Sequence, residues 1–320
     1  MTSASDLVAE ILVHSAIVAA VVQLVVRRVP VTAPVVRLRY RLFTLVLPLA
    51  AAPVFHLLAP VRSDPVFADA ALFSTQQWTR LRVLGVSVRE LAMAPAVTLG
   101  VLLLARDAFR AIAHWRHDRA WRDASRGDEP TRARVERAAW ALATSFRVPP
   151  PRVQVVDTEA AVLHCHGILR PTLVVGSGFT RRLNDAQLEA AIGHELAHLA
   201  HRDVAASWLL MALRLLQWFN PVGQVIARRA IQEMEWRADD AAIAVTKHPA
   251  ALARAIVASA RQGGDVEFLG VLRGSRTTAI EERCRRLIAR SRGGAAPADW
   301  PPWDLAASAL GLSCVLFFVV

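Results

Sequence analysis

Residues 190–203, AAIGHELAHLAHRD, place three histidines and two acids in an otherwise apolar stretch. The segment contains an H-E-x-x-H sequence that begins at His194 and ends at His198. Residues four apart lie on one face of a helix, so both imidazoles can reach a single Zn²⁺. Glu195 projects from the neighbouring position, where it can act as a general base instead of a ligand. His201 shares the face but lies about 10 Å further along the axis, which excludes it as a ligand to the same ion.

A catalytic zinc ion requires a third protein ligand, and the best candidate lies in IQEMEWRADDAA, residues 231–242. Here Asp239 follows Glu235 by four residues, so both share one face of a helix. Glu235 could bind the metal while Asp239 orients a ligand histidine through its second ring nitrogen. Glu233 is the competing ligand. Taken alone, H-E-x-x-H also fits a core helix with a polar face, and the later E-x-x-A-D sequence favours the metal site.

The composition indicates a membrane protein, since 54% of the 320 residues are hydrophobic and the mean hydropathy is +0.33. We predict a mainly α membrane protein with about four transmembrane helices and an inserted cytoplasmic α+β zinc peptidase domain. Glu10 and His14, inside the first apolar run, should face the bundle interior or lie near the outer interface. The predicted spans are residues 7–26, 42–60, 86–105 and 305–320, which leaves a membrane region at 1–105 and a peptidase domain at 106–304.

Charge orients these segments. The net charge is +11, and Lys247 is the only lysine. The stretches 27–41 and 106–122 are strongly basic, whereas 61–90 mixes arginines with acids. The positive-inside rule therefore predicts a multi-pass cell-membrane protein with its N-terminus outside and its peptidase domain in the cytoplasm. The three scattered cysteines have no C-x-x-C spacing, which fits a reducing compartment.

The pattern inside the peptidase domain predicts both strands and helices. RVQVVD (152–157) and TLVVG (172–176) have strand composition, and another short strand is expected between them. A Gly-Ser-Gly turn at 176–178 should follow, and then a helix capped by Asn184 or Asp185. The basic tract RCRRLIARSR, 283–292, is typical of a solvated face, with contact to a membrane surface as the alternative.

The apolar run VAASWLLMALRLLQWF, residues 204–219, raises a question of membrane topology. If it crossed the bilayer once, Glu235 would emerge on the opposite side from His194 and His198. Only PVGQVIARRAIQ, 221–232, is available for a return, and it is too short and carries two arginines. We therefore expect a buried or membrane-surface helix.

The combination of GILRPTLVV, LEAAIGHELAHLAHRD, WFNP and EWRAD resembles the BlaR1/MecR1-like membrane metallopeptidases of family M56. More distantly, it is similar to the HtpX/Ste24-like peptidases of family M48. The resemblance implies a peptidase domain of the gluzincin type, with one Zn²⁺ per chain bound by His194, His198 and Glu235 and with Glu195 as general base. It also implies that a substrate strand pairs with the sheet edge around 163–173.

There are two departures from the family pattern. BlaR1-type receptors carry a C-terminal penicillin-binding sensor domain, which we expect this chain to lack. The only tyrosine, Tyr40, lies in a membrane segment, so His248 or Arg237 would have to stabilise the oxyanion.

The resulting hypothesis is a membrane-anchored zinc endopeptidase that cleaves a cytoplasmic protein in signal transduction, through regulatory proteolysis of a repressor or of itself. Two alternatives stay open: an HtpX-like quality-control protease of membrane proteins, and a non-catalytic signalling scaffold. The expected partners are membrane lipid, a protein substrate such as a DNA-binding repressor, a separate sensor protein and a second copy in a homodimer. Direct nucleic-acid binding is not expected.

Overall fold

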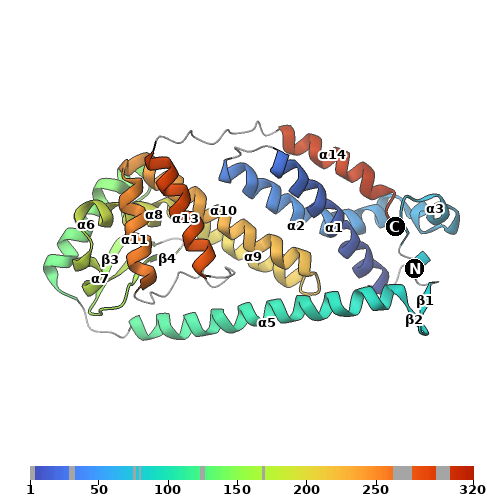
Figure 1. The fold of residues 1–320 in the computed structure, drawn as a ribbon, viewed down its shortest axis with the longest axis horizontal. Helices are drawn as coiled ribbons and strands as arrows, with labels where there is room; N and C mark the ends of the chain where they lie inside the picture. The colour runs from blue at the N-terminus through green and yellow to red at the C-terminus, as the bar shows by residue number, and fades with distance from the viewer. Residues whose placement is uncertain are drawn as a thin grey trace. The chain divides into compact units, whose positions relative to one another are not determined.

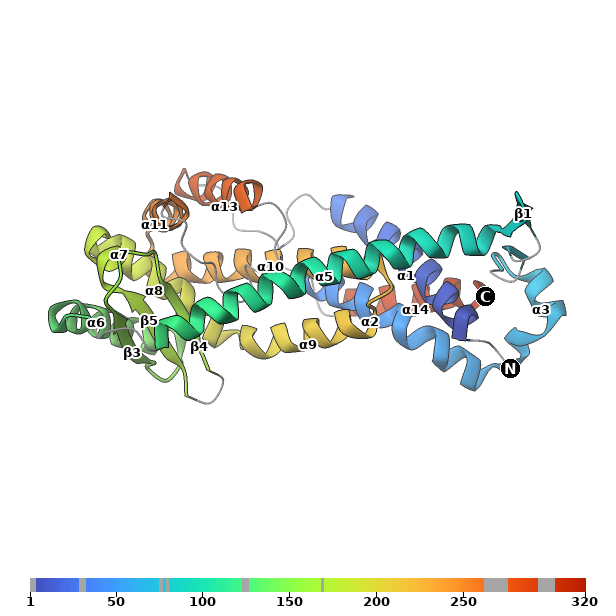
Figure 2. The same ribbon diagram turned by 90° about the horizontal axis from the view of Figure 1, so that it is seen from below.

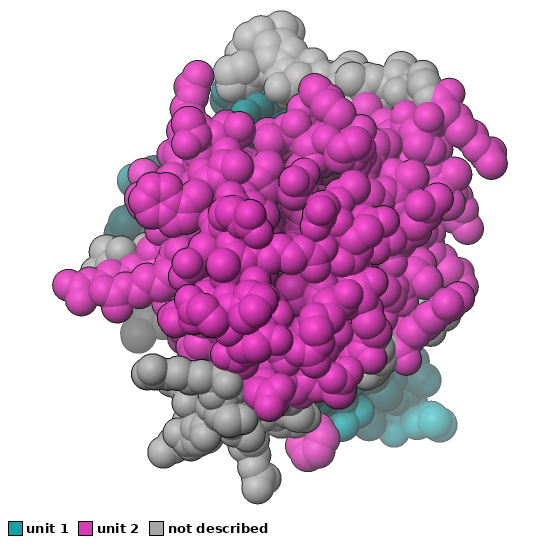
Figure 3. All heavy atoms as spheres, turned by 90° about the vertical axis from the view of Figure 1, so that its left-hand side faces the viewer, with its two compact units in different colours: residues 1–106, 210–230, 297–320 teal, residues 107–209, 231–296 magenta. Residues whose placement is uncertain are grey.

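The computed structural model of the chain describes residues 4–28, 33–74, 77–78, 81–122, 127–167, 170–261, 276–292 and 303–320. The chain divides into two compact units, coloured separately in Figure 3. The first contains residues 1–106, 210–230 and 297–320, and the second contains residues 107–209 and 231–296. The second unit therefore contains the candidate site residues of both segments, 194–198 and 233–239.

The first unit is built from long apolar helices (Figure 1). Three of the four predicted spans coincide with helices long and apolar enough to cross a bilayer, at Ser5–Arg27, Pro34–Leu58 and Val88–Phe109. The helices themselves are α1 (Ala4–Arg28), α2 (Pro34–Leu58) and α5 (Val88–Arg122), and α5 belongs to this unit as far as Arg106. The second begins eight residues before the predicted boundary at 42, because Pro34 suits the first turn of a helix.

The other elements that lie wholly in this unit are short. The fourth predicted span corresponds to α14 (Trp303–Phe317), whose apolar part, Leu305–Phe317, is shorter than a full crossing. The other elements are η1 (Pro60–Ser63), α3 (Pro65–Ala70), β1 (Arg82–Val83) and β2 (Val86–Ser87).

The polar residues of α1 lie inside this helical unit. Glu10 and His14 are both buried. Glu10 accepts a hydrogen bond of 2.8 Å from Arg62 and lies 2.7 Å from the Nε2 atom of His56. Arg62 also donates to the Phe317 carbonyl at 2.9 Å. A charged group in an apolar bundle is tolerated when it is paired in this way.

The second unit carries a three-stranded sheet with helices packed around it (Figure 2). Its strands are β3 (Arg152–Val156), β4 (Leu163–His166) and β5 (Thr172–Gly176) in the order β3-β5-β4. β5 pairs in parallel with β3 and antiparallel with β4. The predicted substrate edge around 163–173 is therefore β4 alone, because β5 is the central strand.

Three helices pack with this sheet: α6 (Glu129–Phe146), α7 (Ser177–Arg182) and α8 (Asp185–Ala200). The predicted turn at 176–178 is wrong, since Gly176 is the N-cap of α7 and the helix begins at once. In α8, the face formed by Leu188, Ile192 and Leu196 is fully buried in the core. This spacing of four residues places the histidines of the same helix on a different face.

Asn184 is the cap of α8. Its side chain accepts from the Gln187 amide at 2.9 Å, and the Gln187 side chain accepts from the Asn184 amide at 3.1 Å. This reciprocal capping box satisfies two backbone donors at the helix start.

The remaining helices are α9 (Asp203–Leu216), α10 (Pro221–Thr246), α11 (Pro249–Arg261) and α13 (Arg276–Ser291).

Candidate metal centre

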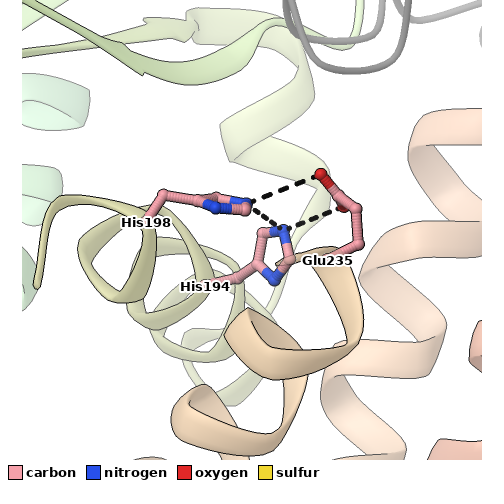
Figure 4. Close-up of side chains that lie close together, drawn as sticks. All are labelled: His194, His198 and Glu235. Atoms are coloured by element: carbon pink, nitrogen blue, oxygen red, sulfur yellow. Dashed lines mark hydrogen bonds and ion pairs between the residues drawn. The ribbon is translucent and has the colours of Figure 1, made fainter. Parts of the chain in front are cut away.

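The structure brings His194, His198 and Glu235 together (Figure 4). The two Nε2 atoms lie 3.1 Å apart. The Glu235 carboxylate oxygens lie 3.6 Å from Nε2 of His194 and 3.7 Å from Nε2 of His198. All three side chains are buried, and in the part of the chain that the structure describes no other trio of His, Cys, Asp or Glu side chains converges in this way.

Each histidine has a carboxylate at its other ring nitrogen. Asp203 Oδ2 lies 2.7 Å from Nδ1 of His198, and Asp239 Oδ1 lies 3.0 Å from Nδ1 of His194. A carboxylate accepts a hydrogen bond from an Nδ1–H group, which assigns the imidazole proton to Nδ1 and leaves the Nε2 lone pair directed at the shared centre. Both histidines therefore present acceptors to the same point as Glu235.

This donor set fits a divalent cation. Two imidazole nitrogens and a carboxylate are ligand types that Zn²⁺ takes, and here their lone pairs face one another. Four ligands at about 2.0–2.1 Å around a tetrahedral ion stand about 3.3 Å apart, close to the distances of 3.1, 3.6 and 3.7 Å measured here. The chemistry and the spacing of the group both suit Zn²⁺.

Two arginines hold the two aspartates. Arg283 donates from Nε and Nη2 to Asp239 at 2.8 and 2.6 Å, and its Nη1 lies 3.0 Å from Glu235. Arg237 contacts Asp203. Burial by itself would raise the pKa of Asp239, but the charge of Arg283 and the hydrogen bonds from His194 and Arg283 outweigh it and hold that pKa well below its usual range. Asp239 therefore stays ionised as the partner of His194.

Glu195 is also buried, and it reaches the edge strand of the sheet. Its Oε2 accepts a hydrogen bond of 3.0 Å from the backbone amide of Cys165 on β4. This contact ties the carboxylate to the strand at which an extended peptide could add to the sheet. His164 and His166 flank Cys165 with ring centroids 6.0 Å apart, and neither belongs to the metal-capable group of described residues.

Other candidates from the sequence lie outside the group. Glu233 is buried on α10 but does not join it. His201 ends α8, where burial and the charge of Arg237 lower its pKa to about 4. Of the two residues weighed for the oxyanion, Arg237 contacts Asp203, and His248 is exposed just before α11.

Sequence reasoning missed two residues of this centre, Asp203 and Arg283. Asp203 follows His198 by five residues, a spacing that does not share a helix face. Arg202 has a positive φ of 56°, which ends α8 and lets the chain turn Asp203 back toward His198. Arg283 was expected on a solvated basic face, and that expectation is wrong: its side chain is 9% exposed and is fixed between two carboxylates.

Comparisons with known proteins agree with this geometry. Residues 152–287 match the family described as BlaR1 peptidase M56. This segment begins at β3 and includes every residue of the centre, up to Arg283 on α13. The chain resembles the BlaR1-like M56 and HtpX-like membrane peptidases.

Individual relatives include both HtpX homologues and a BlaR1 protein. A protease HtpX homolog from Thermococcus kodakarensis is 29% identical over 157 residues, covering 44% of this chain and 54% of the relative. Another, from Thermodesulfovibrio yellowstonii, is 32% identical over 96 residues, covering 26% and 33%. The regulatory protein BlaR1 from Bacillus licheniformis is 27% identical over 77 residues, covering 24% and 13%. The chain thus spans about half or less of the length of these three relatives.

Proposed function

We propose that this chain is a membrane-anchored zinc endopeptidase with a cytoplasmic active site. The observation that carries the proposal is the buried convergence of His194, His198 and Glu235, with a carboxylate at the second nitrogen of each histidine. The protease relatives and the three candidate spans support the same assignment. The side of the membrane follows from the placement of arginines.

Each residue of the centre has a separate role in peptide hydrolysis. When bound by the three ligands, zinc supplies Lewis-acid polarisation of the scissile carbonyl. Glu195 takes a proton from the attacking water and returns it to the leaving amide nitrogen as the C–N bond breaks. The Cys165 amide holds the Glu195 carboxylate in place at 3.0 Å. Asp203 and Asp239 keep the histidines oriented, so the ligands need not rearrange when the site is filled.

The test compares wild type with Glu195→Gln in detergent-purified full-length protein. We expect about one zinc ion per chain in both, since Glu195 is not a ligand, and loss of peptide-bond cleavage only in the variant. Glu189→Gln is the matched control, because Glu189 is exposed on the same helix. Wild-type protein without stoichiometric zinc would refute the metal site, and equal cleavage by both proteins would refute the role of Glu195.

For its biological role, we propose regulatory proteolysis of a DNA-binding repressor or of the chain itself, induced through a separate sensor protein. The similarity to BlaR1, a regulatory protein by name, supports this role. The matches to HtpX homologues favour quality control of membrane proteins as the second candidate. Co-expression with a repressor and with a misfolded membrane protein distinguishes the two by which one is cleaved only when Glu195 is intact. A scaffold without catalysis would cleave neither.

A further inference from the structure

Residues 210–230, named here the α9–α10 hairpin, carry a buried polar network within the first unit. Arg214, Gln217, Asn220 and Gln224 are each at most 1% exposed. Arg214 donates to Gln224 at 2.8 Å, and Gln224 donates back to the carbonyls of Arg214 and Gln217 at 3.0 and 3.2 Å. Asn220 donates to Gln217 at 2.9 Å. These contacts join the two arms of the hairpin across its turn.

The tip of the hairpin meets the candidate spans near their middles. Gln217 donates to the carbonyl of Leu45 at 3.0 Å, and Asn220 donates to the hydroxyl of Ser15 at 2.8 Å. Ser15 lies near the centre of the span Ser5–Arg27, and Leu45 near the centre of Pro34–Leu58. The hairpin tip is therefore level with the middle of both α1 and α2.

The third span makes a backbone contact with the same tip. A Cβ atom added at Gly100, near the middle of Val88–Phe109, would lie 2.7 Å from the carbonyl oxygen of Trp218 and 2.8 Å from the carbonyl carbon of Phe219. Only glycine permits α5 and the turn to approach so closely. Three candidate spans thus contact one turn near their midpoints.

The base of the hairpin lies at the arginine-rich end of α1. Arg229 donates to Gln23 at 2.7 Å, four residues before the span ends at Arg27. Asn220, directly before α10, and Arg229 on α10 are nine residues apart, or about 13.5 Å at ~1.5 Å per residue, roughly half of a ~30 Å hydrocarbon core. The arm therefore runs from the middle of α1 to its arginine-rich end, without reaching the opposite end.

We infer that the α9–α10 hairpin is a re-entrant membrane segment that enters from the Arg27 side, reaches mid-depth and returns. Its exposed apolar side chains would contact lipid acyl chains; they include Leu215, Leu216, Trp218 and Val225. A polar group in hydrocarbon must be satisfied by protein, because no water is available there. The amide network provides this, whereas a hairpin lying on the membrane surface would have water as its partner.

This inference answers the topology question without a complete crossing. A re-entrant hairpin returns to the side from which it came, so His198 before it and Glu235 after it face the same compartment. The stretch 221–232 is too short to be a second span, but a return from mid-depth needs only about half the length of a span. The inference does not depend on proteolysis.

The experiment measures thiol accessibility in membrane vesicles of both orientations, using the full chain without its three native cysteines. The probe position is Trp218→Cys, since Trp218 is 45% exposed at the tip. Arg229→Cys marks the base, and Leu84→Cys, in the turn between β1 and β2, marks the opposite end of the spans. A membrane-impermeant maleimide should label the base in one vesicle orientation, the Leu84 position in the other, and Trp218→Cys in neither.

Labelling of Trp218→Cys by the same maleimide after detergent solubilisation shows that the thiol is present. Labelling in the orientation that exposes Arg229 would place the hairpin on the membrane surface and overturn the inference. Labelling in the other orientation would show a full crossing and overturn it equally. As an independent measure, a short membrane-permeant bis-maleimide should cross-link Ser15→Cys to Asn220→Cys but not Ser15→Cys to Arg229→Cys. Loss of the first cross-link in folded protein also counts against a mid-depth tip.

Discussion

Replacement of Asp239 by asparagine tests whether this buried carboxylate supports the metal centre. The Asp239→Asn variant keeps the size of the side chain but removes the charge that lies 3.0 Å from His194 Nδ1 and that accepts two hydrogen bonds from Arg283. An amide can offer its NH₂ group to Nδ1 instead, which would favour the wrong tautomer of His194. The ligand then loses its fixed orientation.

Two magnitudes follow from these contacts. Loss of the carboxylate behind a ligand histidine typically lowers metal affinity about 10- to 100-fold, or about 1.4–2.8 kcal/mol. Removing one partner of a buried ion pair destabilises a protein by about 3–5 kcal/mol. Glu235, 3.0 Å from Arg283, remains as a partner and should keep the cost near the lower end.

Asp240 provides the matched control, since it is the next residue on α10 and is paired with Arg286 at 3.0 Å. It lies outside the metal group and is 23% exposed in its side chain. A pair that is partly open to solvent contributes about 0–1 kcal/mol. The Asp240→Asn variant should therefore retain wild-type zinc affinity and nearly wild-type stability.

The assay is a competition titration of zinc against a chromophoric chelator, combined with thermal unfolding in detergent with and without the metal. Asp239→Asn should bind zinc more weakly and unfold at a lower temperature than Asp240→Asn. Equal zinc affinity in the two variants would refute the reasoning, even if both were destabilised, because a purely structural ion pair predicts no difference in metal binding.

Three further predictions follow from the same unit. Leu196→Ala should lower the free energy of unfolding by about 2–5 kcal/mol, since Leu196 is fully buried in the core, and denaturant titration measures the loss. Chelation should lower the melting temperature of wild type but not of Glu235→Gln, because saturating metal at about 100 times its Kd stabilises by about 2.7 kcal/mol. Burial and the charge of Arg237 lower the pKa of His201 to about 4, so the folded state favours the neutral imidazole. The stability that this preference contributes is lost as pH falls from 6.5 toward 4. The full pKa shift corresponds to about 3 kcal/mol, and solvent screening of this partly exposed ring reduces that free energy to about 1–2 kcal/mol. The melting temperature of metal-free His201→Gln should therefore fall less between pH 7 and 4.5 than that of metal-free wild type.

Local periodicity was sufficient for much of the fold and for the proposed ligand set. A spacing of four residues predicts that His194 and His198 share a face, and a helix of known rise excludes His201 from the same ion. Apolar runs of about 20 residues predicted the three helices that are long enough to cross a bilayer. These features depend only on residues within a few helical turns of one another, so they can be predicted from the sequence.

Other features required tertiary structure, because they depend on where distant elements pack. Asp203 reaches His198 only through the left-handed break at Arg202. Arg283 lies 44 residues from Asp239, and its burial depends on how α13 packs against the rest of its unit.

The depth of the α9–α10 hairpin is the clearest example of the difference. Its composition fits a surface helix, a buried helix or a membrane segment equally well. Its contacts with Ser15, Leu45 and the backbone near Gly100 assign its tip to the middle of three spans. Hydrophobic periodicity specifies which side of a helix is buried, but it contains no information about which partner buries it, and only the packed structure supplies that partner.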